Sequence, residues 1–175
     1  ANHAGLELIC GLTIYAVDID NGTISVIDQN PQYHPKGTFG GRRQNHNFTS
    51  VADYDQDGHL DIIANVARNS FKDKPAVYYW NVFKNETKVF YPPNQWTHGT
   101  GRVNIANIDD VPGLNCTFAT GTRIYALDEK FELKWEFAIK EGSSGNTGTT
   151  VFDFNGDGKS EIVYRDESFL FILKD

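Results

Sequence analysis

The feature of this chain that most limits its fold is a pattern of two short strands that occurs twice. The segments GLTIYAVD (11–18) and GTRIYALD (121–128) share the pattern G-x-x-I-Y-A-[VL]-D, and each continues through a turn into another apolar run. Similar runs of roughly four to eight residues, rich in Val, Ile, Tyr, Phe and Thr, fill much of the remaining sequence. Strands that are this short and this frequent predict an all-β protein.

An acidic pattern repeats in step with these strands. The stretch VADYDQDGHLDIIAN (51–65) contains the first copy, which begins at Asp53; a second copy begins at Asp153, and a weaker one begins at Asn107 between them. Repeats of roughly 40 to 55 residues with four strands in each are typical of β-propeller blades. We therefore predict a β-propeller of four-stranded antiparallel blades.

The repeat divides the chain, as a single domain, into four blade units at residues 1–45, 46–98, 99–145 and 146–175. A full unit has strand A, the acidic loop, strand B, and then strands C and D joined by hairpins. The first unit begins at strand B and the last ends at strand C, which gives about three and a half blades, whereas propellers typically close with four to eight. We expect a larger parent protein to complete the ring; the alternatives are partner chains or an open array.

The residue types in the acidic loops point to a bound cation. In the first loop Asp53, Asp55 and Asp57 stand at alternate positions, so their carboxylates share one side of a curled backbone. A glycine then permits the sharp turn, the main-chain carbonyl of His59 supplies a neutral oxygen, and Asp61 completes the shell. Hard oxygen ligands on a flexible loop suit Ca²⁺ better than Mg²⁺, which prefers a stricter octahedron.

The second loop keeps this scheme with one amide ligand and a longer acid. Its equivalent ligands are Asp153, Asn155, Asp157, the carbonyl of Lys159 and Glu161. An EF-hand would need a Glu at loop position 12 and a helix on each side, but Ala64 and Tyr164 stand at that position and strand-like runs follow. The sequence therefore predicts two calcium sites that are not EF-hands.

A solvated turn without metal is the alternative for these loops. Three or four carboxylates converging without a cation would repel one another, which favours the metal. The middle copy keeps Asn107 and Asp109, but Val111 stands at the third ligand position and cannot bind a metal. We therefore expect the middle loop to be a metal-free turn.

The two strong loops resemble a known repeat. FTSVADYDQDGHLDII (48–63) is similar, nearly residue for residue, to the FG-GAP or VCBS-type repeats of integrin-α-like β-propellers, and TTVFDFNGDGKSEIV (149–163) is similar from its valine onward. Through the repeat the resemblance covers essentially the whole chain. It implies a calcium-stabilised propeller with the ligand sets given above, in a protein that is extracellular, secreted or at the cell surface. Millimolar calcium outside cells suits sites of modest affinity.

The segments that precede each strand A offer a candidate ligand-binding face. These segments (40–47, 95–102 and 141–148) are equivalent by position, and in a propeller such connections lie on one face. The residues that would contact a carbohydrate or a protein are Arg42, Arg43, His46, Trp96, His98 and Arg102. The alternative is a set of polar connecting loops, with Trp96 packed between blades.

The charge and the composition of the chain argue against some classes of function. A formal charge of −7 argues against binding nucleic acid, and no apolar run approaches the roughly 18 residues of a membrane span. Cys10 and Cys116 lack zinc spacing, and we expect two free, buried thiols, with a disulfide as the alternative.

The chain lacks the H-E-x-x-H and G-x-S-x-G motifs, so an enzyme is not the favoured interpretation. We expect an extracellular module for adhesion or for binding a protein or carbohydrate ligand, within a larger protein. The alternatives are a segment of a carbohydrate-active enzyme, such as a polysaccharide lyase with a calcium-binding propeller, and an architectural spacer.

Overall fold

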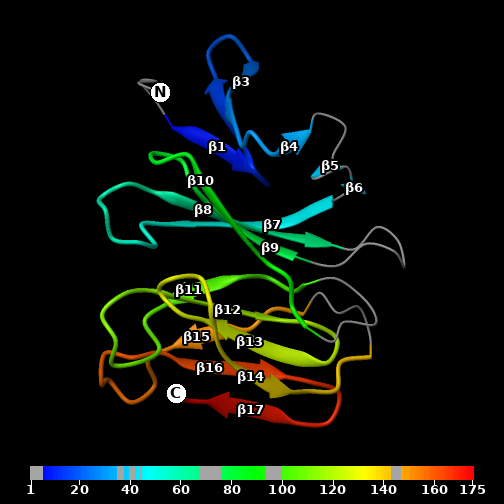
Figure 1. The fold of residues 1–175 in the computed structure, drawn as a ribbon, viewed down its shortest axis with the longest axis vertical. Helices are drawn as coiled ribbons and strands as arrows, with labels where there is room; N and C mark the ends of the chain where they lie inside the picture. The colour runs from blue at the N-terminus through cyan, green and yellow to red at the C-terminus, as the bar shows by residue number, and fades with distance from the viewer. Residues whose placement is uncertain are drawn as a thin grey trace.

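The computed structural model describes residues 6–34, 38–39, 42–43, 45–67, 76–93, 100–142 and 147–175. Within these residues every regular element is a β-strand, and every strand pair is antiparallel (Figure 1). The predicted all-β class is therefore confirmed, together with antiparallel sheets of three or four strands.

Four sheets account for most of the strands. Sheet I has the order β1 (Glu7–Cys10), β2 (Thr13–Asp18), β3 (Thr23–Gln29). Sheet II has the order β10 (Glu86–Phe90), β9 (Ala76–Asn81), β8 (Asp61–Ala67), β7 (Asn45–Ala52). Sheet III has the order β11 (Asn104–Ala106), β12 (Asn115–Ala119), β13 (Arg123–Leu127), β14 (Leu133–Ala138). Sheet IV has the order β15 (Thr150–Phe152), β16 (Glu161–Arg165), β17 (Leu170–Leu173).

A small fifth sheet lies between sheets I and II in the chain. It contains three strands of two residues each: β4 (Tyr33–His34), β5 (Thr38–Phe39) and β6 (Arg42–Arg43). Arg42 and Arg43, two of the residues predicted to contact a ligand, are therefore on its last strand.

The four main sheets stack face to face in a row, from sheet I to sheet IV (Figure 1). The first strand of each sheet lies beside that of the next, with β1 against β7, β7 against β11 and β11 against β15. In the described part of the chain the row is open at both ends, so sheets I and IV each have one neighbouring sheet.

Alternating side chains explain how the inner sheets bury both faces. Along β9, Tyr78 and Trp80 face sheet I and pack with Leu12, whereas Val77 and Tyr79 face sheet III. Successive side chains on a strand point to opposite faces, so a strand between two sheets is apolar throughout. Full burial of an apolar side chain of this size contributes about 1.5–3 kcal/mol, and the aromatic residues therefore supply much of the stacking energy.

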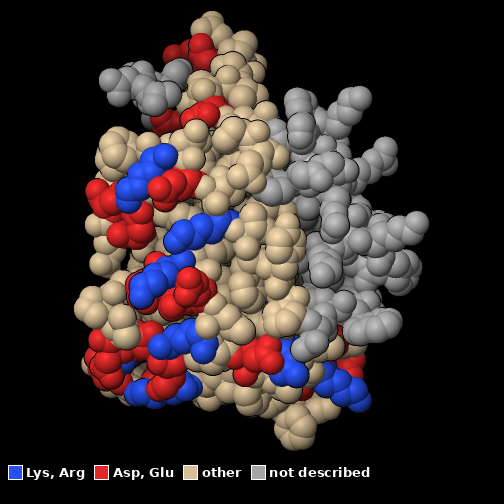
Figure 2. Space-filling view, in the orientation of Figure 1, with Lys and Arg blue, Asp and Glu red and all other residues tan. Residues whose placement is uncertain are grey.

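The strand connections place the acidic loops together. The loops between β7 and β8, between β11 and β12, and between β15 and β16 leave their sheets at the same end, at the left of Figure 1. Figure 2 shows Asp, Glu, Lys and Arg side chains gathered along this edge of the molecule. The fold thus brings three segments that are distant in the sequence to one edge.

The two cysteines differ in their surroundings. Both are free thiols, and Cys116 is fully buried, as expected, in the core between sheets II and III. Burial raises the pKa of the Cys116 thiol. Cys10 is exposed, so its expected burial is wrong: it ends β1 at an edge of sheet I, next to the turn at Gly11.

Candidate metal centre

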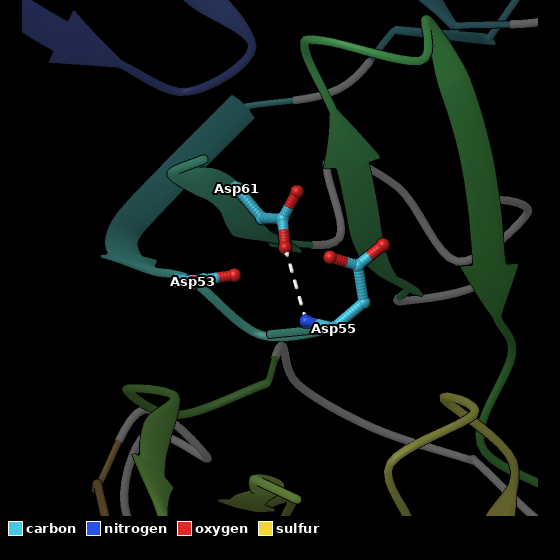
Figure 3. A group of neighbouring side chains, drawn as sticks. All are labelled: Asp53, Asp55 and Asp61. Carbon is cyan, nitrogen blue, oxygen red and sulfur yellow. Dashed lines mark hydrogen bonds between the residues drawn. The ribbon is translucent and has the colours of Figure 1, made fainter. Parts of the chain in front are cut away.

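Three carboxylates from the first acidic loop converge at the end of sheet II. Oxygen atoms of Asp53, Asp55 and Asp61 all lie within 4.8 Å of one another. Asp53 follows β7, Asp61 begins β8, and Asp55 lies in the loop between them, as Figure 3 shows. The structure thus brings together three of the five predicted ligands of the first site.

The main chain of the loop fixes these carboxylates. The N–H of Tyr54 donates to Asp61 Oδ2 at 2.9 Å, and that of Asp55 donates to the same oxygen at 3.3 Å (Figure 3). Gly58 donates its N–H to Asp53 Oδ2 at 3.0 Å from a left-handed backbone conformation with φ of 89°. A glycine adopts this conformation without strain, which is why the pattern needs it at this position.

Two carboxylate oxygens in the cluster are left without a donor. Asp53 Oδ1 and Asp61 Oδ1 are both buried and accept no hydrogen bond from the described residues. The side chain of Asp61 is 0% exposed, and its burial raises its pKa to about 6 even though main-chain donors and the hydroxyl of Tyr79 act in the opposite direction. A buried, unpartnered carboxylate oxygen costs free energy, which a cation at this position would offset.

This donor set fits a hard divalent cation. All of its candidate ligand atoms are oxygens, and several are charged, which is the chemistry that Ca²⁺ and Mg²⁺ prefer. The side chains of Asp53, Asp55 and Asp61 would hold the ion, and main-chain donors already orient Asp53 and Asp61.

Asp57 joins the cluster through two residues that the sequence did not single out. Asn81 Nδ2, at the end of β9, lies 3.0 Å from Asp55 Oδ2 and 3.2 Å from Asp57 Oδ2. The ammonium of Lys84 lies 2.6 Å and 2.8 Å from the same two oxygens. Its hydrogen bond to Asp57 is the largest reason that the pKa of that carboxyl is lowered to about 2. The only sequence signal was a lysine in the hairpin that follows strand C.

His59 contributes its main chain to the first loop. Its N–H donates to Asp57 Oδ1 at 2.9 Å, while its imidazole stacks on the ring of Phe83 with 3.9 Å between centroids. The side chain therefore contacts the neighbouring hairpin. Binding of metal by the His59 carbonyl stays a prediction.

The second loop has the same main-chain geometry as the first. Gly158 donates its N–H to Asp153 Oδ2 at 2.9 Å, matching the 3.0 Å bond from Gly58 to Asp53. The two glycines have φ values of 86° and 89°. Gly156 has a φ of 74° where the first loop has Gln56 at 57°. Two sequences that differ at several positions thus form one loop conformation.

The acid that ends each loop is also bound in the same way. Phe154 donates its N–H to Glu161 Oε2 at 2.9 Å, as Tyr54 does to Asp61 at the same distance. Glu161 is buried, and its other oxygen accepts a hydrogen bond from Asn155 Nδ2 at 2.8 Å. The longer Glu side chain therefore reaches the position that Asp61 occupies in the first loop.

A lysine contacts the second loop, as Lys84 contacts the first. Lys174, after β17, lies 2.7 Å from Asp157 Oδ2 and 3.8 Å from Glu161 Oε1. Its hydrogen bond is the largest reason that the pKa of Asp157 is lowered to about 2. The N–H of Lys159, whose carbonyl is a predicted ligand, donates to Asp157 Oδ1 at 2.9 Å, and its ammonium pairs with Asp110.

The middle loop keeps a main-chain hydrogen bond of the other two loops but has different side chains at the ligand positions. Asn115 ends this loop, and its Oδ1 accepts the N–H of Ile108 at 3.1 Å, which is the role of Asp61 in the first loop. Asp109 is buried and is bound by Asn115 Nδ2 at 3.1 Å and by the ammonium of Lys134 at 2.9 Å. Asn115 stands eight residues after Asn107, as Asp61 does after Asp53, so the sequence spacing could have indicated this partner of Asp109. Nothing in the sequence indicated Lys134.

The predicted ligand-binding face is described only in part. The structure describes only the main chain of Arg42, Arg43 and His46, which lie in β6 and β7. Trp96 and His98 lie outside the described residues. Arg102 is exposed.

The described ends of two connecting segments, residues 100–102 and 147–148, lie together. A Cβ added at Gly101 would collide with the carbonyl of Thr147, and one at Gly148 would lie 2.8 Å from Arg102 Cβ. The segment before β11 thus packs closely on the segment before β15.

Comparison of the chain with protein-family models, with curated proteins and with solved structures gave no match. The likeness to FG-GAP repeats therefore rests on the motif residues alone. The described part of the chain holds no helix with the length and apolarity needed to cross a membrane.

Proposed function

We propose that this chain is a calcium-stabilised β-propeller segment in which two acidic loops each bind one Ca²⁺. The observation that carries the proposal is the environment of Asp61. This carboxylate is fully buried, one of its oxygens has no donor among the described residues, and Asp53 and Asp55 lie within 4.8 Å. A calcium ion would supply the missing positive partner and relieve the repulsion within the group.

The proposed role of the ion is to hold the ends of two strands and a core side chain. Asp53 and Asp61 flank the loop, so an ion that binds both would tie the end of β7 to the start of β8. Tyr54 lies between two of the ligands, and its ring is buried in the core between sheets II and III. The free energy of metal binding would then add to the free energy of folding, because the metal site does not exist in the unfolded chain.

The propeller arrangement is supported by the stacking of the sheets. Each main sheet packs face to face on the next, the first strands are neighbours, and the acidic loops lie at one edge. The remaining sheets of such a ring would come from a longer chain or from partner chains. The wider role that we propose is an extracellular module for adhesion or for binding a protein or carbohydrate ligand, and its support is the resemblance of the two acidic loops to FG-GAP repeats.

Calorimetric titration of the chelator-treated protein with CaCl₂ tests the metal proposal. We expect two binding events in the native chain, and Asp57→Ala should remove the event of the first loop. Asp109→Ala is the matched control, because it removes a carboxylate from the loop that Lys134 and Asn115 already satisfy. Absence of calcium binding by the native chain, or loss of one event in Asp109→Ala, would overturn the proposal.

The binding role is tested separately on a glycan array with calcium and with EDTA. Calcium-dependent retention on a defined class of glycans would support a carbohydrate-binding module. Turnover of an acidic polysaccharide would instead assign the chain to the enzyme class. The calorimetric result is independent of either outcome.

A further inference from the structure

The two sheets at the ends of the row each expose an apolar face. On sheet IV, Leu170 and Ile172 are 65% and 61% exposed, and Phe154 in the adjacent loop is 58% exposed. On sheet I, Leu6 and Leu8 are 90% and 49% exposed and line a shallow groove. Contiguous apolar surface of this kind marks a site of interaction more often than a solvated face.

The outer face of sheet IV is equivalent to a face that is buried within the chain. In sheet II, Ile63 pairs with Tyr79, and in sheet IV, Val163 pairs with Ile172 in the same register. Two residues further along β8 and β16, Asn65 pairs with Val77, and Arg165 pairs with Leu170.

The same superposition, continued into the acidic loops, places Phe154 at the position of Tyr54. Leu170 and Ile172 accordingly occupy the positions of Val77 and Tyr79. Tyr54, Val77 and Tyr79 all belong to the core cluster that packs on sheet III. The exposed face of sheet IV is therefore equivalent to the face with which sheet II packs on sheet III.

The outer face of sheet I is equivalent to the other half of that interface. The repeated pattern places GLTIYAVD over GTRIYALD, and Leu8 pairs with Tyr15 in the register in which Phe118 pairs with Tyr125. Phe118 and Tyr125 are both 0% exposed because sheet II covers them. The exposed face of sheet I is therefore equivalent to the face of sheet III that packs on sheet II.

We propose that two copies of this chain associate head to tail, with sheet IV of one copy packed on sheet I of the other as sheet II packs on sheet III. The chain has the two complementary faces of one interface at opposite ends of its row of sheets. The exposed face of sheet IV in one copy can therefore bury the exposed face of sheet I in another copy. Such contacts are heterologous: they close into a ring if the rotation permits, and otherwise propagate. The inference rests on the observed stacking and does not require calcium.

Sedimentation velocity over a concentration series in calcium-containing buffer tests the proposal. The native chain should associate. Ile172→Glu on sheet IV and Leu8→Glu on sheet I should each weaken self-association at least about tenfold, because a buried charge would replace an apolar contact. Leu133→Glu, at an exposed position of the inner sheet III, is the matched control and should associate like the native chain.

Mixing the two variants gives the decisive result. Each variant keeps one intact face, so an equimolar mixture should form a one-to-one dimer although each variant alone is monomeric. A native chain that stays monomeric would overturn the proposal, and so would a mixture that fails to associate. Calorimetric calcium binding should be unchanged in both variants, and so should the melting temperature when it is measured at a dilution at which the native chain is monomeric; this separates the result from the metal proposal.

Discussion

The phenolic hydroxyl of Tyr54 donates a hydrogen bond to the main-chain carbonyl of Asp128 across the boundary between sheets II and III. Tyr54 lies between two carboxylates of the first acidic loop, and Asp128 follows β13 at the start of the hairpin to β14. One residue thus connects the candidate metal centre with the neighbouring sheet. Its ring also contacts Tyr79 and Phe131, with centroids 5.6 Å and 6.1 Å away.

Replacing Tyr54 by Phe should destabilise the protein without disturbing the packing of the ring. The substitution removes the donor to Asp128 and leaves a carbonyl at the boundary without this partner, so we expect a loss of about 1 kcal/mol in the free energy of unfolding. Urea unfolding monitored by fluorescence measures it. Tyr91→Phe, at an exposed position, is the control, and equal stability of both variants would contradict the prediction.

Removal of calcium should lower the melting temperature of the native chain. A ligand that binds only the folded state stabilises it, and chelation withdraws that contribution. Asp61→Asn should reduce the shift, since it weakens the first site and also relieves the unpartnered buried charge. Thermal unfolding with calcium and with EDTA measures both effects. A native melting temperature that does not respond to EDTA would contradict the prediction.

Lys84→Gln should strengthen calcium binding at the first loop. The Lys84 ammonium contacts one oxygen each of Asp55 and Asp57, two of the predicted ligands, so its positive charge would compete with that of the ion. The side chain is 41% exposed on a flexible stem, which lets it leave the site. We expect an affinity gain of about two- to tenfold by calorimetry. Lys130→Gln is the control for loss of one exposed positive charge, and equal gains in both variants would point to a general charge effect.

Asp166 should make the stability of sheet IV depend on pH. Its carboxylate accepts main-chain N–H bonds from Lys140 at 3.0 Å and from Ser168 at 2.8 Å, and these bonds hold its pKa below the usual range. A lowered folded-state pKa contributes stability above the unfolded-state pKa, near 4, and this contribution is lost as the pH falls through the folded-state value.

Asp166→Asn should therefore be less stable than the native chain at pH 7, with a difference that narrows below about pH 4. Urea unfolding of both proteins at a series of pH values measures the difference. Asp20→Asn is the control for the loss of one negative charge in an exposed hairpin. A difference between Asp166→Asn and the native chain that is constant with pH would exclude this origin.

Local chemistry made much of the fold and the loops predictable from the sequence. The apolar run of β9 and the turn residues between strands depend on near neighbours, so they indicated short strands joined by tight turns directly. The convergence of Asp53, Asp55 and Asp61 also follows from local backbone curvature. Closure of the sheets into a propeller involves contacts beyond these segments and stays a proposal.

Partners that are distant in the sequence could not be predicted in this way. Asn81 and Lys84 reach the first loop from the far end of β9, and Lys134 reaches Asp109 from β14. These contacts depend on how the sheet twists and on which rotamer a long side chain adopts. The exposure of Cys10, compared with the burial of Cys116, depends in the same way on position within the row of sheets.

In the first two of the three loops, the residue at the second position packs toward the next sheet in the row. Tyr54 enters the core shared with the following sheet, and Ile108 packs with Ile162 of the sheet after its own. Phe154 has the same place in the last loop but remains largely exposed. An ion at the first loop would therefore reinforce the boundary on its C-terminal side, whereas an ion at the last loop has no such boundary to reinforce until another sheet packs there. If both loops bind calcium, the two ions would thus have unequal effects: the first would stabilise the boundary between sheets II and III, and the second would stabilise only the loop beside the exposed face of sheet IV.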